Sequence, residues 1–139
     1  MHQIRSYLKP HTTGLAVLLI TLTAAWLRFY KLGEWGFWGD EVFSLTNKPD
    51  GFMISLSTRL IHAVTGLLGS NEFNARLAPA LIGIATIPIL YYLTAQVFGR
   101  QAGLISSALL AISHWHIYWS QNARFYVLLL LFYTLAMMY

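Results

Sequence analysis

Long apolar segments separated by short polar ones dominate this chain. Residues 14–30, 77–98 and 102–119 are mostly apolar, and each is of the length that crosses the roughly 30 Å of a bilayer's hydrocarbon core. A fourth apolar segment, residues 126–139, is shorter than the roughly 20 residues that a span needs. The pattern predicts an all-α, polytopic transmembrane protein with three complete spans and a truncated fourth.

The first apolar segment follows a short basic tail, residues 1–13, which we expect to lie in the cytoplasm. A basic start, an apolar core and small residues at Ala24 and Ala25 also fit a cleaved signal peptide. Further apolar segments follow, and these need no separate export signal. We therefore favour a transmembrane helix over residues 14–30, with Arg28 snorkelling outward at its end.

The long polar connection, residues 31–76, contains all five acidic residues of the protein. This concentration of acidic residues predicts that the active site lies on this side of the membrane, and we expect the segment to be an external loop. Between Phe52 and Leu68, apolar residues recur at helical spacing, which is typical of an amphipathic helix in the membrane interface. A helix packed on a protein core would give the same pattern.

Prolines and small residues refine the second and third segments. Pro79 falls in the first turn of the predicted second span, where it is tolerated, and Pro88 falls in its interior, where it predicts a kink. A minimal polar turn follows at residues 99–101. The third span begins with small residues, including Gly103 and Ser107, and these predict close helix contact.

Composition supports this class and excludes others. The chain is 57% hydrophobic and 10% charged, whereas a soluble domain carries about 25% charged residues. Its net charge of +4 comes from nine scattered basic residues without a run or stripe, so nucleic acid is not an expected partner. The absence of cysteine excludes disulfides and thiolate metal sites.

An adjacent pair of carboxylates, Asp40 and Glu41, lies among aromatic residues and glycines just after the first segment. Two neighbouring carboxylates cannot both ionise freely, so we expect one of them to have a raised pKa and to serve as a general base. The alternative is a solvated loop that Trp35 and Trp38 anchor at the membrane interface.

Counting the predicted membrane crossings places four charged residues on the same side of the membrane. Asp40, Glu41, Arg76 and Arg124 fall on the same side of the membrane in either orientation. Carboxylates and arginines at one face predict a site for an anionic substrate, because guanidinium binds phosphate through two parallel hydrogen bonds. Arg76 could instead anchor a helix end at the lipid headgroups.

The two histidines of the third segment, His114 and His116, raise the question of a metal site. Side chains two residues apart on a helix diverge by about 200°, so we expect no shared metal ion. We interpret both as polar residues at an interface.

Several motifs carry a family resemblance in the same order along nearly the whole chain: Leu27-Arg-Phe-Tyr-Lys-Leu-Gly33, Trp38-Gly-Asp-Glu41, Ala75-Arg-Leu-Ala-Pro-Ala-Leu-Ile-Gly83, Gly103-Leu-Ile, Leu110-Ala-Ile-Ser113 and Tyr118-Trp-Ser-Gln-Asn-Ala-Arg-Phe-Tyr126. Together they resemble the N-terminal part of the membrane-embedded GT-C glycosyltransferases of the protein O-mannosyltransferase and aminoarabinose-transferase type. Such enzymes pass a sugar from a polyprenyl-phosphate carrier to an acceptor hydroxyl outside the cytoplasm, with inversion.

The resemblance implies roles for individual residues. Asp40 would deprotonate the acceptor hydroxyl, and Glu41 would orient the loop or tune the pKa of Asp40. Arg124 and Arg76 would hold the lipid phosphate, and Tyr126 would add a hydrogen bond, although an interfacial tyrosine is the alternative. No metal or other cofactor is implied, and the expected location is an inner or plasma membrane.

The chain departs from the family in two respects. Many relatives have a His-Pro-Pro segment after the acidic pair, whereas Lys48-Pro49-Asp50-Gly51 offers one proline. Family members are also several times longer. We therefore expect an N-terminal portion that is inactive without the remaining helices or a partner subunit. The alternative is a small non-catalytic membrane protein, or a degenerate remnant, that serves as a partner.

Overall fold

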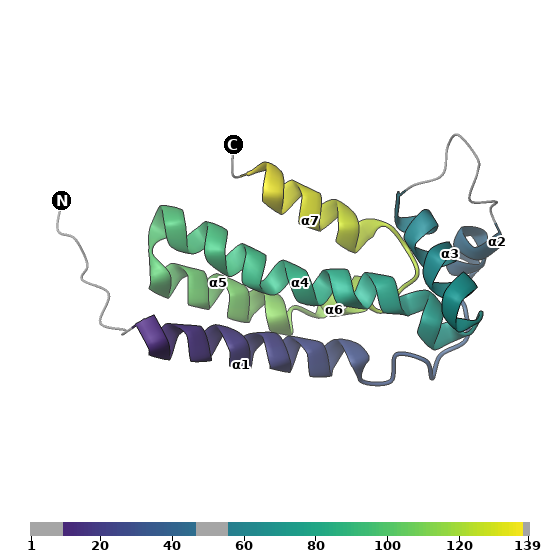
Figure 1. Cartoon of the computed structure of the whole chain (residues 1–139), viewed down its shortest axis with the longest axis horizontal. Coiled ribbons are helices and arrows are strands. Elements are labelled where there is room, and N and C mark those ends of the chain that lie inside the picture. Colours follow the sequence, from purple (N-terminus) through teal and green to yellow (C-terminus); the bar gives the residue numbers. More distant parts are fainter. Residues whose placement is uncertain (1–9, 47–55, 138–139) are drawn as a thin grey trace.

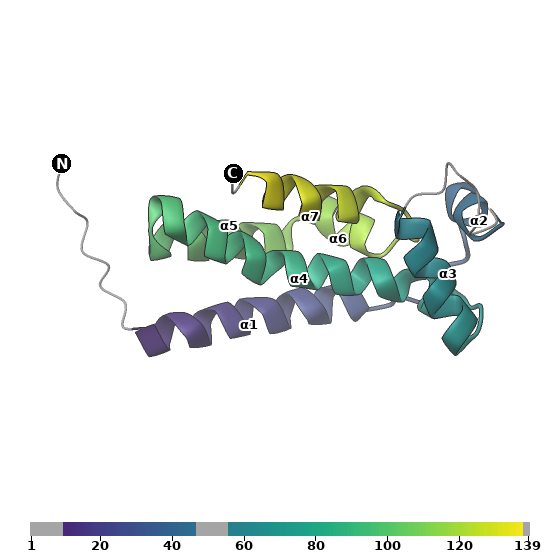
Figure 2. The ribbon, with the colours of Figure 1, turned by 45° about the horizontal axis from the view of Figure 1, so that its top comes forward.

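The computed structural model describes residues 10–46 and 56–137, and within these ranges every regular element is a helix, as predicted. Two short helices, α2 (Gly39–Thr46) and α3 (Leu56–Leu68), lie together at one end of the molecule. The others run along the long axis (Figures 1 and 2): α1 (Pro10–Phe29), α4 (Glu72–Phe98), α5 (Arg100–Ile112), α6 (His114–Ser120) and α7 (Tyr126–Ala136).

The central helix is α4, which packs against α1, α3, α5, α6 and α7. It begins after Asn71, whose side-chain oxygen accepts a hydrogen bond from the Asn74 N–H at 2.8 Å, and it ends at Gly99, where φ is +90°. The helix therefore starts five residues before the predicted span 77–98. Pro79 consequently lies in its interior, and the prediction that it occupies the first turn was wrong.

The segment predicted as one helix over residues 102–119 is broken. Ser113 has extended backbone angles that end α5, and its hydroxyl accepts a hydrogen bond from the His116 N–H at 3.5 Å to cap α6. The apolar pattern continues across Ser113 and so concealed this break. The two helices still follow one another along the bundle (Figure 1), and their joint crossing of the membrane stays a prediction.

The close contact predicted from small residues is confirmed where α5 meets α4. A Cβ added to Gly103 would lie 2.8 Å from the Tyr91 carbonyl oxygen and 2.9 Å from the Ala95 Cβ. Ser107, one turn further on, is buried. Only a residue without a side chain lets the two backbones approach this closely.

Polar and apolar side chains are distributed as in a membrane protein. The interior of the bundle buries Thr86, Ser107 and Thr134, whose hydroxyls donate to carbonyls of their own helices. The outer side of α1 exposes large apolar side chains: Leu15, Leu18, Leu19, Leu22 and Trp26. An apolar surface of this size is unfavourable in water and favourable in lipid.

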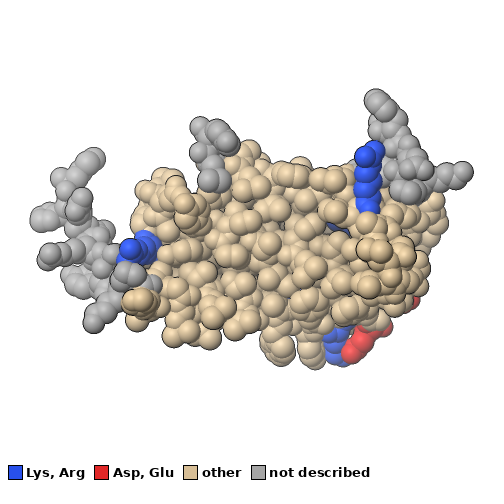
Figure 3. All heavy atoms as spheres, in the orientation of Figure 1, with Lys and Arg blue, Asp and Glu red and all other residues tan. Residues whose placement is uncertain are grey.

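Two helical stretches, His11–Phe29 and Glu72–Phe98, are long and apolar enough to cross a membrane. The space-filling view agrees with this reading, because most of the visible face between the two ends is tan, with one small recessed blue patch right of its centre (Figure 3). Acidic atoms on that face lie at the end occupied by α2 and α3 (Figure 3).

The predicted amphipathic helix is present as α3, while residues 52–55 of the prediction lie outside the described ranges. It turns Ser57, Ile61 and Thr65 toward the protein. Its leucines at helical spacing point away and are exposed: Leu56, Leu60 and Leu67. The apolar stripe is thus available to a membrane surface, but a place in the interface stays a prediction.

Two predictions about polar side chains in the bundle were wrong. Arg28 does not snorkel outward but is fully buried, and His116 does not lie at an interface but is fully buried beside it. Arg28 reaches acceptors on α5 and α6 that lie more than 80 residues away in the chain, so local sequence could not reveal them.

Candidate active site

The acidic pair lies at the start of α2, where the chain forms a reciprocal cap. The Trp38 carbonyl accepts a hydrogen bond from the Glu41 N–H at 2.9 Å, and the Glu41 carboxylate accepts one from the Trp38 N–H at 3.1 Å. Adjacent side chains on a helix point about 100° apart. As a result, Glu41 turns inward and is 1% exposed, whereas the side chain of Asp40 turns outward and is 76% exposed.

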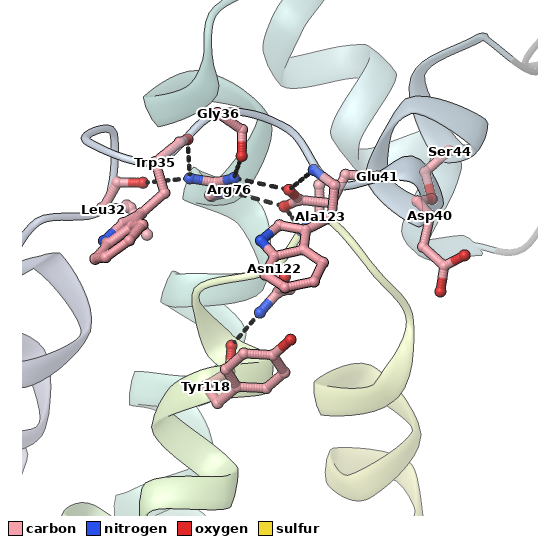
Figure 4. A network of polar contacts seen from close by, with 11 residues as sticks. Leu32, Trp35, Gly36, Asp40, Glu41, Ser44, Arg76, Tyr118, Asn122 and Ala123 are labelled. Atoms are coloured by element: carbon pink, nitrogen blue, oxygen red, sulfur yellow. Dashed lines mark hydrogen bonds and ion pairs between the residues drawn. The ribbon is translucent and has the colours of Figure 1, made fainter.

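Glu41 forms a buried ion pair with Arg76 on α4. The Arg76 Nε and Nη2 donate to the two carboxylate oxygens at 2.9 and 2.7 Å. The Ala123 N–H, from the connector between α6 and α7, donates to the same carboxylate at 2.7 Å. Figure 4 shows these groups converging on Glu41, so one side chain joins the N-terminus of α2, the first turns of α4 and the connector.

The remaining donors of Arg76 hold the loop that precedes α2. They bind the carbonyl oxygens of Leu32, Trp35 and Gly36 at 2.9 to 3.1 Å. With the two bonds to Glu41, this engages all five N–H groups of the guanidinium. Arg76 is also only 3% exposed, so in this arrangement it has no donor left for a phosphate.

The environment of Glu41 determines its ionisation. Burial alone raises the pKa of the Glu41 carboxyl, but hydrogen bonds from Arg76, Ala123 and Trp38 outweigh burial and hold the pKa below its ordinary value of 4.5. The sequence predicted a raised pKa for one of the two carboxyls without specifying which, and the pKa of Glu41 is shifted the other way. The reason is that the inward carboxylate meets donors instead of its neighbour's charge.

Asp40 forms a looser pair with Arg124. The distance from the Arg124 Nη2 to the Asp40 Oδ2 is 3.8 Å, and the Arg124 Nη1 instead binds the Asp40 carbonyl oxygen at 3.0 Å and the Ser44 hydroxyl at 3.3 Å. The Arg124 Nε has no hydrogen-bond partner. Figure 4 shows the Asp40 carboxylate pointing away from the network around Arg76. Asp40 and Arg124 therefore retain unused hydrogen-bonding capacity.

Two hollows open beside the acidic pair. One, of about 220 Å³, is lined by Asp40, Glu41 and Arg124 together with aromatic residues. The second, of about 250 Å³, is lined by Lys31, Arg76 and the aromatic residues of the preceding loop. Three residues line both hollows: Trp38, Tyr118 and Asn122. The site thus combines a carboxylate, cations, an amide and aromatic rings around two adjoining spaces.

The predicted site residues do gather at one end of the molecule. Asp40, Glu41, Arg76 and Arg124 lie in one connected network, as the crossing count required. Tyr126 does not line either hollow, but its ring lies 4.0 Å from that of Trp119, a wall residue of the first. The shared wall residues were not predicted as site residues, although the aromatic motifs around them provided a signal.

Residues 48–139 match the protein family described as dolichyl-phosphate-mannose-protein mannosyltransferase. The match covers more than half of the chain. The chain belongs to this family. Membership in the mannosyltransferase family confirms the GT-C glycosyltransferase resemblance and, with the two apolar helices, indicates a membrane protein. No curated protein and no solved structure matched the chain.

The family match covers only part of the candidate site. It includes Arg76, Arg124 and Tyr126, and it begins after the acidic pair. Asp40 and Glu41 are connected to the matched range by the hydrogen bonds of Arg76, Ala123 and Arg124. The family match therefore assigns no role to Asp40 or Glu41.

Proposed function

We propose that the protein is the N-terminal portion of an inverting glycosyltransferase that moves a sugar from a polyprenyl-phosphate carrier to an acceptor hydroxyl. The observation that carries this proposal is the contrast within the acidic pair. Glu41 is buried and fully bonded, while the Asp40 carboxylate faces an open hollow beside a cationic side chain. A carboxylate free to accept a proton is what a single displacement requires.

In this reaction Asp40 acts as the general base. The acceptor oxygen attacks the anomeric carbon while its proton passes to the Asp40 carboxylate, and the bond from that carbon to the phosphate oxygen breaks. The electron pair of that bond leaves with the lipid phosphate. The exposed position of Asp40 supports this role because an incoming hydroxyl can reach it.

Arg124 is the proposed partner of the lipid phosphate. Its Nη1 is engaged by the Asp40 carbonyl oxygen and Ser44, while Nη2 makes only the 3.8 Å ion pair. A guanidinium with unused donors can stabilise the negative charge that develops on the leaving phosphate. Tyr126, two residues after Arg124, would add a hydrogen bond to the phosphate once its side chain adopts another rotamer.

Arg76 was a candidate for the same phosphate, and the geometry favours a different role. All its donors are engaged within the protein, and releasing one would uncover a buried carbonyl or carboxylate. We propose that Arg76 and Glu41 act together to hold the loop that presents Asp40. The orientation with a cytoplasmic N-terminus and an external site, in an inner or plasma membrane, is part of the same proposal.

The decisive experiment compares Asp40→Asn with Glu34→Gln in the full-length protein, using radiolabelled polyprenyl-phosphate mannose and native membranes as the source of acceptor. Glu34 is the matched control because it is an exposed acid of the same loop, paired with Lys31 at 3.0 Å. We expect Asp40→Asn to lower transfer about 10²- to 10⁴-fold at unchanged membrane level, and Glu34→Gln to leave it unchanged. Undiminished transfer by Asp40→Asn would remove Asp40 from the mechanism, whereas no transfer above background by the unsubstituted protein would favour the non-catalytic partner.

A further inference from the structure

A charged residue is buried in the helix bundle away from the acidic pair. Arg28, at the C-terminal end of α1, is 0% exposed, and no carboxylate of the described residues lies within ion-pair distance of it. Burying a guanidinium without an anion is costly unless its donors find strong acceptors. The acceptors of Arg28 therefore indicate what it does.

One acceptor is the Ala24 carbonyl of its own helix, which the Arg28 Nη1 contacts at 3.0 Å, and the others come from the break in the third apolar segment. Because Ser113 ends α5, the carbonyls in the last turn of that helix lose their usual partners four residues on, and only that of Leu110 accepts a backbone hydrogen bond at the cap, from the Ser113 N–H at 3.2 Å. The Arg28 Nη1 donates to the Ala111 carbonyl at 3.0 Å, and its Nη2 donates to the Leu110 carbonyl at 3.4 Å. Arg28 thus caps α5, where a cation also meets the negative end of the helix dipole.

The same guanidinium holds α6 on the other side of the break. Its Nη2 contacts the His116 Nδ1, and the Ser120 hydroxyl donates to the His116 carbonyl at 2.6 Å. Gly83 on α4 makes room for this cluster, because a Cβ there would lie 2.8 Å from the Ser120 Cβ and 3.3 Å from the Arg28 Nε. Four helices therefore meet at one buried cation.

Gln121, the first residue after α6, binds the C-terminal end of α1. The side-chain amide of Gln121 donates to the carbonyls of Leu27, Arg28 and Tyr30 at 2.9 to 3.2 Å, which caps the end of α1. Each of the two segments therefore caps the other's helix end. The connector that continues from Gln121 supplies the Ala123 N–H to Glu41 and the Arg124 side chain to Asp40.

We infer that Arg28 is a positioning residue: by capping the broken α5 and holding α6, it sets where the connector presents Ala123 and Arg124 to the acidic pair. The effect on position is independent of any reaction, and only its effect on transfer rests on the proposed function. An arginine that merely anchored a helix end at the headgroups would be exposed and replaceable by lysine. A lysine in this buried position has a single ammonium group, which cannot replace a planar guanidinium that bonds to groups on α1, α5 and α6 at once.

Residues 1–139 contain no cysteine, so an introduced pair is unique within them and can carry spin labels once any cysteine in the rest of the full-length protein is replaced by serine. We would place spin labels at Lys31→Cys and Tyr118→Cys in the full-length protein. These two residues line the same hollow, Lys31 just after α1 and Tyr118 on α6. Arg28→Gln and Gly83→Ala should shift or broaden the distance distribution between the labels. The matched controls are Arg100→Gln, outside the cluster, and Gly14→Ala, where an added Cβ meets nothing within 4 Å.

The transfer assay supplies the second readout. Arg28→Lys should lower kcat/KM about tenfold to a hundredfold because the site is displaced, and the label distance should change with it. An unchanged distance in both Arg28→Lys and Gly83→Ala would overturn the inference whatever the catalytic result. If Arg28→Gln does not fold, Arg28→Lys and Gly83→Ala still decide. Since Asp40→Asn should lower transfer about 10²- to 10⁴-fold without moving the labels, failure of the proposed function is distinguishable from failure of this inference.

Discussion

Two neighbouring carboxylates in one helix turn form ion pairs of opposite character. Glu41 and Arg76 are buried, with a shortest N–O distance of 2.7 Å, while Asp40 and Arg124 meet at 3.8 Å with the aspartate largely exposed. Helical rotation between adjacent positions turns one side chain into the protein and the other out of it. The first pair therefore organises the backbone, and the second remains available for chemistry.

Breaking the buried pair should have the largest effect. Arg76→Met leaves the Glu41 carboxylate buried without its cation, so we expect the free energy of unfolding to fall by about 3–5 kcal/mol. Thermal unfolding of the purified full-length protein in detergent, followed by tryptophan fluorescence, would measure it. Arg124→Met is the matched control, with an expected change within about 1 kcal/mol because its partner is exposed. Equal losses in both variants would contradict the contrast between the pairs.

Lowering the pH should weaken the Glu41–Arg76 pair, and we expect this to destabilise the protein less than Arg76→Met does. Because the pKa of Glu41 in the folded protein lies below its ordinary value of 4.5, the Glu41 contribution is fully present above that pH. It is lost as the pH falls below 4.5 toward the folded-state pKa. Unfolding midpoints measured across this range should therefore drop in the wild type and drop less in Glu41→Gln. Parallel curves for the two proteins would show that Glu41 is not the group responsible.

The smallest expected effect on stability is that of Asp40→Asn. Its side chain is 76% exposed and its ion pair is long, so the free energy of unfolding should change by no more than about 1 kcal/mol. The same thermal measurement tests this, with Lys31→Met in the exposed Lys31–Glu34 pair as a second control that should leave the midpoint unchanged. A large destabilisation by Asp40→Asn would mean that the outward carboxylate also supports the fold.

Local patterns predicted much of this protein correctly. The apolar segments indicated helices, the small residues around Gly103 indicated a close contact, and the crossing count brought the acidic pair to the side of Arg76 and Arg124. The motifs also identified the family. Each of these depends on side chains that are close in sequence or on the number of membrane crossings.

The sequence by itself thus determined the helical class, the membrane character, the family and the end of the molecule that carries the candidate site. Only the tertiary structure decided which carboxylate is buried, that all five N–H groups of Arg76 are hydrogen-bonded within the protein, and that Arg28 caps the end of α5. The physical reason is sequence distance: the acceptors and donors that define these roles lie 35 to 88 residues away. Helical periodicity contains no information about which distant backbone group will meet a given side chain.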